Sequence, residues 1–186
     1  KEKEWGESDE DLQDKKTVDI ADWVTSNLLG PEQNNTLIII EGTSGQGKTA
    51  FCRMFVSRVK EEIYPAYIPI YIRLQDINSR FVDMKESLNK YLNAIRYFNE
   101  NEGWLTDFNK RFAIILDGFD ELPLSNADTM QFLEEILKFQ EETPGQFILT
   151  GRTGFIEAFQ DIFQQHSVCR GIIQPMSDKI QLSWIK

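Results

Sequence analysis

The sequence predicts an α/β fold in which a mostly parallel β-sheet carries helices on both faces. Short apolar runs alternate along the chain with longer stretches whose apolar residues recur at helical spacing. The run Phe112–Leu116 is apolar throughout, as expected of a strand that is covered on both faces. A glycine-rich segment at 42–47 joins another apolar run, Leu37–Glu41, to a helical stretch. This order of elements is typical of parallel strands joined by right-handed helical crossovers.

The expected elements follow one another with turn signals between them. Strands are expected at 37–41, 67–74, 112–116, 146–150 and 172–173. Helices are expected at 17–29, from about Lys48 to Ile63, and at 82–98, 127–140 and 155–163. Gly30-Pro31 and Pro144-Gly145 end two of these helices. Because Pro69 has no backbone N–H to donate, the strand 67–74 is expected at an edge of the sheet.

Length and composition fit one soluble domain. A chain of 186 residues can bury one good core, and no apolar run approaches the roughly 18 residues that cross a bilayer. The charged N-terminus has no signal-peptide pattern. Cys52 and Cys169 form neither a zinc nor a disulfide pattern. We therefore expect a cytoplasmic protein without a membrane span.

Negative charge is concentrated at the start of the chain. Residues 1–36 carry −6 of the formal net charge of −10. Because binding to a nucleic acid backbone requires clustered Lys and Arg, we expect no direct nucleic acid binding. Residues 1–16 are expected to form an acidic, partly disordered leader. The patterned apolar sequence 180–186 has no helix cap or turn signal at its end, so the chain is expected to be a fragment of a longer protein.

Residues 42–49 read Gly-Thr-Ser-Gly-Gln-Gly-Lys-Thr and follow a strand directly. This spacing is that of the phosphate-binding loop of P-loop NTPases. Its glycines allow backbone torsions that wrap a phosphate chain with N–H groups, and the following helix points its positive dipole end at the same anion. Lys48 would hold the β- and γ-phosphates and act in catalysis, and Thr49 would bind Mg²⁺. The expected nucleotide-binding residues of the loop are Gly42, Thr43, Ser44, Gly45, Gln46, Gly47, Lys48, Thr49 and Ala50.

A second group of candidates follows the apolar strand 112–116. Asp117 stands at its carboxyl end, where an acid would hold the hydration shell of Mg²⁺. Gly118 adds almost no bulk beside a nucleotide. Asp120 and Glu121 lie one turn further on, where a carboxylate would orient or deprotonate the attacking water. Asp117 is therefore the expected metal ligand, with Asp120 and Glu121 as catalytic candidates.

Two arginines stand at the ends of other strands. Arg152 follows the strand 146–150, at the edge where open α/β sheets bind ligands, and would reach a γ-phosphate. The alternative for Arg152 is a surface arginine paired with an acid. Arg73 is more simply a partner for Asp76 or for a helix end.

Together these segments resemble the NACHT domain, a branch of the STAND class of P-loop ATPases. The similarity is carried by 42–49, 68–77, 114–122 and 147–152, and Asp117 followed by a small residue and an acidic pair is its most specific part. It implies a three-layer α/β/α P-loop NTPase fold with a five-stranded sheet of order 2-3-4-1-5. It also implies that the domain binds ATP or GTP with Mg²⁺ and hydrolyses it slowly. The bound nucleotide would then act as a switch that controls self-association. Residues 17–186 would then form the NACHT-like domain, with effector and sensor domains elsewhere in the protein.

The chain departs from the family in one respect, and two alternative functions stay open. NACHT proteins continue into a winged helix whose histidine contacts the β-phosphate, whereas the one histidine of this chain, His166, is expected at the surface. The first alternative is a P-loop small-molecule kinase, although the arginine cluster of a kinase lid is missing from the sequence. The second alternative is a nucleotide-binding interaction domain that hydrolyses nothing.

Overall fold

The computed structural model describes residues 18–30, 36–77, 111–122, 124–142 and 145–174. Its centre is a five-stranded sheet in which every ladder is parallel. The strands are β1 (Leu37–Glu41), β2 (Ile68–Arg73), β3 (Phe112–Asp117), β4 (Gln146–Gly151) and β5 (Val168–Ile172). Their order is β2-β3-β4-β1-β5, so the predicted fold class and strand order are confirmed.

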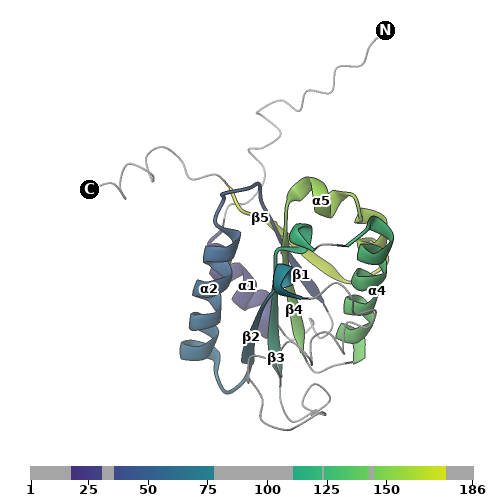
Figure 1. The fold of residues 1–186 in the computed structure, drawn as a ribbon. Helices are drawn as coiled ribbons and strands as arrows, with labels where there is room; N and C mark the ends of the chain where they lie inside the picture. The colour runs from purple at the N-terminus through teal and green to yellow at the C-terminus, as the bar shows by residue number, and fades with distance from the viewer. Residues whose placement is uncertain (1–17, 31–35, 78–110, 123, 143–144, 175–186) are drawn as a thin grey trace, which may run out of the picture.

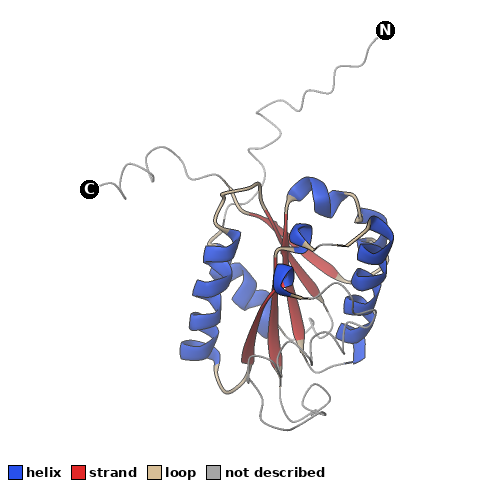
Figure 2. Ribbon diagram, in the orientation of Figure 1, coloured by secondary structure: helices blue, strands red, loops and turns tan. Residues whose placement is uncertain are grey.

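Helices cover both faces of the sheet (Figures 1 and 2). The helices are α1 (Ile20–Leu29), α2 (Lys48–Arg58), α4 (Asn126–Glu142), α5 (Thr153–Glu157) and α6 (Gln160–Phe163). One π-helical turn, Val59–Ile63, extends α2, and short 3₁₀ turns follow β2 (Leu74–Asp76) and β3 (Phe119–Glu121). In Figure 1, α1 and α2 lie on one side of the sheet and α4 and α5 on the other. Among the described residues, no helix has the length and apolar character of a membrane span.

The alternation of side chains along each strand divides the core into two layers. On β1, Ile38 and Ile40 pack with α1 and α2, whereas Leu37 and Ile39 pack with α4, α5 and α6. Every residue of β1, β3 and β4 is buried, as the continuous apolar runs predict. The three central strands thus form a buried platform for the loops at the carboxyl ends of the sheet.

The strand boundaries follow the predictions except at β5. Pro69 lies in β2, and β2 is an edge strand, as predicted. The last strand was predicted at 172–173, but it begins at Val168. The prediction missed the start of this strand because Cys169, Arg170 and Gly171 are neither alternating nor strongly apolar, and β5 forms through pairing with β1.

The other departures from the prediction are small. The helix predicted at 155–163 is divided into α5 and α6. The predicted helix at 82–98, the acidic leader at 1–16 and the terminal segment 180–186 lie outside the described residues.

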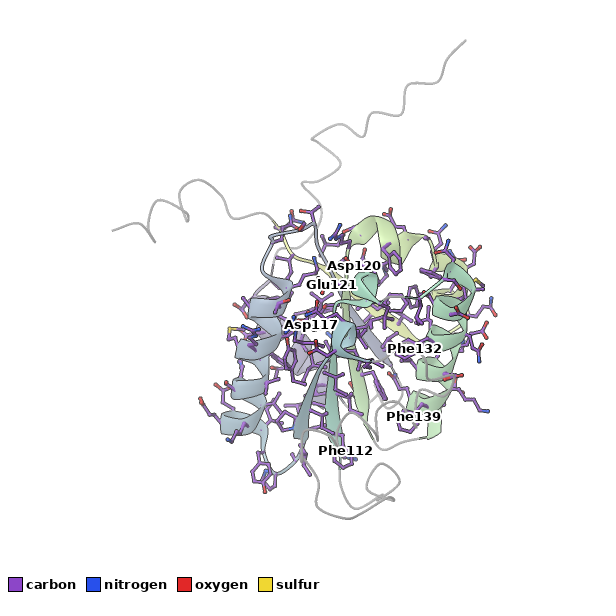
Figure 3. The ribbon with its side chains drawn as sticks, viewed as in Figure 1. Phe112, Asp117, Asp120, Glu121, Phe132 and Phe139 are labelled. Carbon is purple, nitrogen blue, oxygen red and sulfur yellow. The ribbon has the colours of Figure 1, made fainter. Side chains whose placement is uncertain are left out.

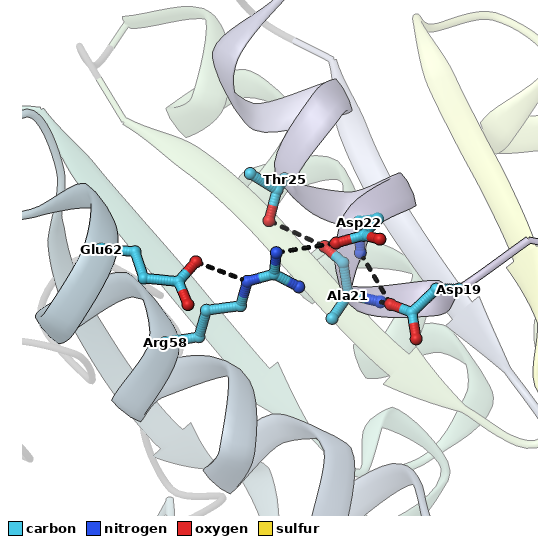
Figure 4. A network of polar contacts seen from close by, with 6 residues as sticks. All are labelled: Asp19, Ala21, Asp22, Thr25, Arg58 and Glu62. Atoms are coloured by element: carbon cyan, nitrogen blue, oxygen red, sulfur yellow. Dashed lines mark hydrogen bonds and ion pairs between the residues drawn. The ribbon is translucent and has the colours of Figure 1, made fainter.

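Helix α1 is attached to the domain by polar contacts as well as by its apolar face. Asp19 caps it, because its Oδ1 accepts hydrogen bonds from the backbone N–H of Ala21 and Asp22. Figure 4 shows Arg58 of α2 between two acids, Asp22 of α1 and Glu62, at 2.7 and 2.9 Å. On β5, Gly171 leaves room for Trp23 of α1, since a Cβ there would lie 2.9 Å from the indole ring.

Candidate functional site

The carboxyl ends of the parallel strands meet at one edge of the sheet, which we call the carboxyl edge. β1 runs into the glycine-rich loop there, β3 ends in Asp117, and β4 leads into Arg152. Figure 3 shows Asp117, Asp120 and Glu121 gathered at this edge and Phe112 at the opposite end of β3. All the sequence-predicted site residues therefore come from segments at the carboxyl edge.

Lys48 and Asp117 approach this edge from neighbouring elements. Lys48 is the first residue of α2, and Cys52 follows one helical turn later. The Sγ atom of Cys52 lies 3.7 Å from Oδ1 of Asp117. The ammonium and the metal-ligand candidate thus belong to one region, as the hypothesis of a nucleotide site requires.

The loop at 42–49 has the backbone conformations that its glycines permit. Gly45 and Gly47 have φ angles of 80° and 88°, in the left-handed region that other residues rarely adopt. Gly47 is also the N-cap residue of α2. The ammonium of Lys48 donates hydrogen bonds to the carbonyl oxygens of Gly42 (2.7 Å) and Thr43 (3.0 Å). Of the three N–H donors of an ammonium group, these contacts use two, which leaves one for an anion.

Two other loop residues contact one another. The Oε1 atom of Gln46 accepts a hydrogen bond from the backbone N–H of Thr43 and lies over Gly42, where a Cβ would come within 2.8 Å of it. This contact uses the Thr43 N–H inside the loop. The other predicted binding residues, Ser44, Thr49 and Ala50, are exposed.

Glu41 ends β1 and supports the base of the loop. Its side chain is fully buried, and its Oε1 accepts a hydrogen bond from Nε of Arg170 on β5 at 2.6 Å. The backbone carbonyl of Glu41 also accepts a hydrogen bond from the N–H of Ile173 at 2.8 Å. The chain leaving β5 is therefore attached directly to the residue before Gly42.

Asp117 is buried at the end of β3 and accepts three hydrogen bonds. The donors are the hydroxyl of Tyr71 on β2 (2.9 Å), the hydroxyl of Thr150 on β4 (2.8 Å) and the thiol of Cys52 on α2. Burial and Asp117 raise the pKa of Tyr71 to about 12, and they raise the pKa of the Cys52 thiol well above its usual range. Both groups therefore stay protonated at neutral pH and act as donors to the Asp117 carboxylate.

The next residues turn sharply and fix the acidic pair. Gly118 has a φ angle of 84°, and its N–H donates to the Thr150 hydroxyl at 3.0 Å. The fully buried ring of Phe119 packs against Phe155 and Phe159. The exposed Glu121 folds back over Gly118, where a Cβ would lie 3.1 Å from Oε2 of Glu121. The absence of a side chain at position 118 thus lets the Glu121 carboxylate lie beside the end of β3.

Asp120 and Arg152 form a close ion pair. Nε of Arg152 lies 2.7 Å from Oδ2 of Asp120, and the backbone N–H of Arg152 donates to Oδ1 at 3.1 Å. The Asp120 side chain is 6% exposed and that of Arg152 is 58% exposed. Arg152 is thus paired with an acid, as the alternative interpretation predicts, while much of its side chain faces solvent. Arg73 lies 3.9 Å from Asp76, as expected.

The donor set fits Mg²⁺ as a nucleotide-bound ion. Mg²⁺ prefers hard oxygen ligands and is commonly held by one or two protein groups together with phosphate oxygens. Asp117 supplies a carboxylate at a strand end, and Thr49 supplies an exposed hydroxyl at the start of α2. Among the described residues, no group of three or more His, Cys, Asp and Glu side chains would hold a metal by itself. A metal at this edge would therefore need the phosphates of a nucleotide.

Sequence reasoning missed three residues that surround Asp117, namely Tyr71, Thr150 and Cys52. A signal was present in the strand alternation: Tyr71 and Thr150 lie at or near the ends of their strands and face the α2 layer, as Asp117 does. Cys52 also stands one helical turn after Lys48. Their contacts with Asp117 depend on how the strands and α2 are arranged in space, which the sequence pattern of each segment does not give.

Comparison with known proteins agrees with this geometry. Residues 32–159 match the family described as AAA domain. Solved structures with a similar fold include the Aeropyrum pernix ORC1 protein in complex with DNA (17% identity, TM-score 0.59) and Drosophila ORC bound to GC-rich DNA and Cdc6 (14%, 0.59). Another is C. elegans PCH-2 (14%, 0.52). No curated protein sequence matches the chain significantly.

The matched structures are longer than this chain. The alignments cover 88%, 89% and 88% of this chain but 45%, 29% and 43% of the A. pernix ORC1, Drosophila ORC and PCH-2 chains. The similarity to these structures is therefore one of fold over a single domain.

One expectation from composition is wrong. We expected no direct nucleic acid binding because the chain is acidic, but two of the similar structures are complexes with DNA. The net charge of a chain does not decide this question, because contacts with a nucleic acid backbone depend on local groups of Lys, Arg and N–H donors. An acidic composition thus does not exclude nucleic acid as a partner of this fold.

The five-stranded parallel sheet, the glycine-rich loop between β1 and α2, and the acid at the end of β3 agree with the family match over residues 32–159. The chain belongs to the AAA domain family of P-loop NTPases.

Proposed function

We propose that this chain binds ATP or GTP with Mg²⁺ at the carboxyl edge and hydrolyses it slowly. The observation that carries the proposal is the approach of Asp117 to Cys52, one turn along α2 from Lys48. It brings a cation, the N-terminus of a helix and a carboxylate to one edge of the sheet. These are the groups that a metal-bound polyphosphate requires.

The loop residues would bind the phosphates in this proposal. Ser44, Gly45, Gln46, Gly47 and Ala50 would contribute backbone groups, and Lys48 its ammonium. Gly42 and Thr43 would do so once their N–H groups leave Gly151 and Gln46. The Lys48 ammonium would donate its third N–H to a phosphate oxygen while it keeps its contacts with the loop carbonyls. Thr49 and Asp117 would hold Mg²⁺, which when bound neutralises charge on the phosphate oxygens.

Glu121 is the residue that we assign to the attacking water. Asp120 is committed to Arg152, whereas the Glu121 carboxylate is exposed and lies beside Gly118. In hydrolysis the water oxygen bonds to the γ-phosphorus, the bond from that phosphorus to the bridging oxygen breaks, and the water proton passes to Glu121. Asp120 would then act indirectly, by holding Arg152 at the end of β4.

Arg152 would contact the γ-phosphate while it stays paired with Asp120. Its guanidinium has five N–H donors, and the ion pair with Asp120 is made through Nε. Because the side chain is 58% exposed, its terminal nitrogens remain available to an anion. This arrangement favours sensing of the terminal phosphate over a purely structural ion pair.

We further propose that the chain is a NACHT domain of the STAND class of P-loop ATPases, because of the Asp-Gly-Phe-Asp-Glu segment at 117–121. In that case residues 17–186 would be a nucleotide-binding domain of a longer signalling or defence protein, with 1–16 as its acidic leader. The nucleotide would control oligomerisation of that protein as a switch. The attachment of Ile173 to Glu41 supports this idea, because it couples the chain leaving β5 to the phosphate loop.

The test measures binding of a fluorescent ATP analogue to the 186-residue chain with Mg²⁺ present. Lys48→Ala should lower the affinity by at least about 100-fold, roughly 2.7 kcal/mol, because the triphosphate loses its principal counter-charge. Lys60→Ala is the matched control, since Lys60 is an exposed lysine on the turn that extends α2. It should bind as the wild type does.

Equal affinity of Lys48→Ala and the wild type would exclude the site. Release of phosphate from ATP, measured in the same samples with and without acceptor molecules, separates hydrolysis from phosphotransfer. A wild type that binds ATP without releasing phosphate would support a non-hydrolysing interaction domain instead.

A further inference from the structure

The Asp117 carboxylate is enclosed by donors from three separate elements: Tyr71 on β2, Thr150 on β4 and Cys52 on α2. Only 5% of the Asp117 surface is exposed. A buried carboxylate needs such donors, because charge removed from water is costly unless it is hydrogen-bonded. Three independent elements thus converge on one side chain that the proposed function uses.

The two oxygens of Asp117 have different surroundings. Oδ1 accepts hydrogen bonds from the Thr150 hydroxyl at 2.8 Å and from the Cys52 thiol at 3.7 Å. Among the described residues, the donor to Oδ2 is the Tyr71 hydroxyl at 2.9 Å. A carboxylate oxygen has two lone-pair sites, so Oδ1 is saturated and Oδ2 keeps capacity for one more donor. Oδ2 is therefore the oxygen that can accept a metal-bound water.

The donors also decide how the carboxylate is rotated. The terminal torsion of an aspartate is broad and roughly two-fold, so it has little preference of its own. Thr150 is itself fixed, because its oxygen also accepts the N–H of Gly118 at 3.0 Å. Tyr71 is fixed by its place on β2, where it faces the α2 layer. Thr150 and Cys52 therefore hold the Oδ1 side of the carboxylate, and the contact from Tyr71 restrains Oδ2 directly.

We propose that Tyr71 is a positioning residue for the magnesium–nucleotide site, which acts by holding Oδ2 of Asp117 in one orientation. This inference rests on the proposed function. Tyr71 itself touches neither nucleotide nor metal in this scheme; its effect passes through Asp117. Removing the hydroxyl takes the donor from Oδ2 and loosens its orientation, so the site needs more Mg²⁺ to form, while contacts between the loop and the phosphates stay intact.

The experiment compares Tyr71→Phe with Tyr67→Phe. Tyr67 is the control, because its hydroxyl also donates a hydrogen bond to an oxygen atom, the carbonyl of Leu28, at 3.0 Å. Tyr67 precedes β2 at the end opposite the carboxyl edge. Each variant removes one oxygen atom and keeps the ring, and thermal unfolding checks that both chains fold.

Three quantities are measured: the affinity for the fluorescent ATP analogue in EDTA, the Mg²⁺ concentration at half-maximal stimulation of binding, and Mn²⁺ binding by electron paramagnetic resonance. In Tyr71→Phe, the affinity in EDTA should equal that of the wild type, and the half-saturating Mg²⁺ concentration should rise at least about tenfold, as for other residues that orient metal ligands. Mn²⁺ binding with nucleotide should weaken by a similar factor. Tyr67→Phe should match the wild type in all three.

The outcomes separate this inference from the proposed function. An unchanged Mg²⁺ requirement in Tyr71→Phe would overturn the inference and leave the nucleotide site standing. An equal rise in Tyr67→Phe would also overturn it, because the effect would then be a general loss of stability. A wild-type chain without Mg²⁺-dependent nucleotide binding would contradict the proposed function itself, and the inference with it.

Discussion

Two polar clusters of this domain use similar chemistry in opposite surroundings. The Asp117 cluster (Asp117, Tyr71, Thr150 and Cys52) lies at the carboxyl edge around a buried carboxylate and joins four elements, β3, β2, β4 and α2. The Arg58 cluster (Arg58, Asp22 and Glu62) lies on the surface and joins α1 to α2, with the two acids 68% and 59% exposed. Both clusters have short contacts. Arg58 lies 2.7 and 2.9 Å from its two acids. The hydroxyls of Thr150 and Tyr71 lie 2.8 and 2.9 Å from Asp117.

The difference in burial decides what each cluster contributes. Water screens the Arg58 cluster, and exposed ion pairs add little to stability. Water is largely excluded from the Asp117 cluster, so each missing donor leaves a buried polar group unsatisfied. Short distances alone therefore do not identify an important contact. Three predictions test this contrast.

Replacing Glu121 probes the chemistry beside the buried cluster. Glu121→Gln should keep nucleotide binding and lower the rate of hydrolysis by about 10²–10⁴, roughly 3–5 kcal/mol of barrier, because an amide cannot accept the water proton. The rate of hydrolysis is measured as phosphate release under saturating ATP. Asp120→Asn is the comparison, since Asp120 is paired with Arg152. If Glu121→Gln hydrolysed ATP like the wild type, Asp120 would become the better candidate for the water-activating acid.

Replacing Thr150 probes the stability of the buried cluster. Thr150→Val removes a donor to Asp117 and the acceptor of the Gly118 N–H, and should cost about 1–3 kcal/mol of unfolding free energy, measured in urea. Thr150→Ser keeps the hydroxyl and should therefore retain most of the unfolding free energy that Thr150→Val loses.

Thr129→Val is the matched control for this experiment. Thr129 is also buried, at 1% exposed, and its hydroxyl donates to the carbonyl of Ser125. That carbonyl keeps the hydrogen bond from the Thr129 N–H, so the change leaves no polar group unsatisfied. If Thr129→Val and Thr150→Val lost the same free energy of unfolding, the claim that an unsatisfied group in the Asp117 cluster is costly would be contradicted.

Replacing Arg58 should have the smallest effect of the three. Arg58→Ala should lower Tm only slightly, and the difference from the wild type should vanish in about 1 M NaCl, where charges are screened within about 3 Å. Asp19→Ala should cost more, about 1 kcal/mol, because Asp19 caps the backbone of α1 directly. A salt-resistant loss in Arg58→Ala larger than that of Asp19→Ala would contradict our account of the surface cluster.

Much of the site was predictable because it is local in sequence. The spacing of 42–49 predicts the loop between a strand and a helix, and Asp117 follows a run that is apolar throughout. The pairing of Asp120 with Arg152 was not predictable in the same way, because 32 residues separate them. The sequence left Asp120 and Glu121 equivalent, and the ion pair distinguishes them.

The last strand shows the complementary limit. The stretch Val168–Ile172 contains Arg170 and Gly171 and has weak strand character. It forms an edge strand because β1 offers unpaired backbone groups, and because Arg170 pairs with the buried Glu41. Both reasons lie in residues more than a hundred positions away in the chain.

The sequence by itself determined the fold class, the phosphate loop and the acid at the end of β3. These features follow from apolar periodicity, glycine torsions and the spacing of neighbours, which act over a few residues. Tertiary structure alone decided the three donors around Asp117, the partner of Arg152 and the extent of β5. The physical reason is that hydrogen bonds and ion pairs depend on contacts across the sheet, and strand order sets which distant side chains can meet.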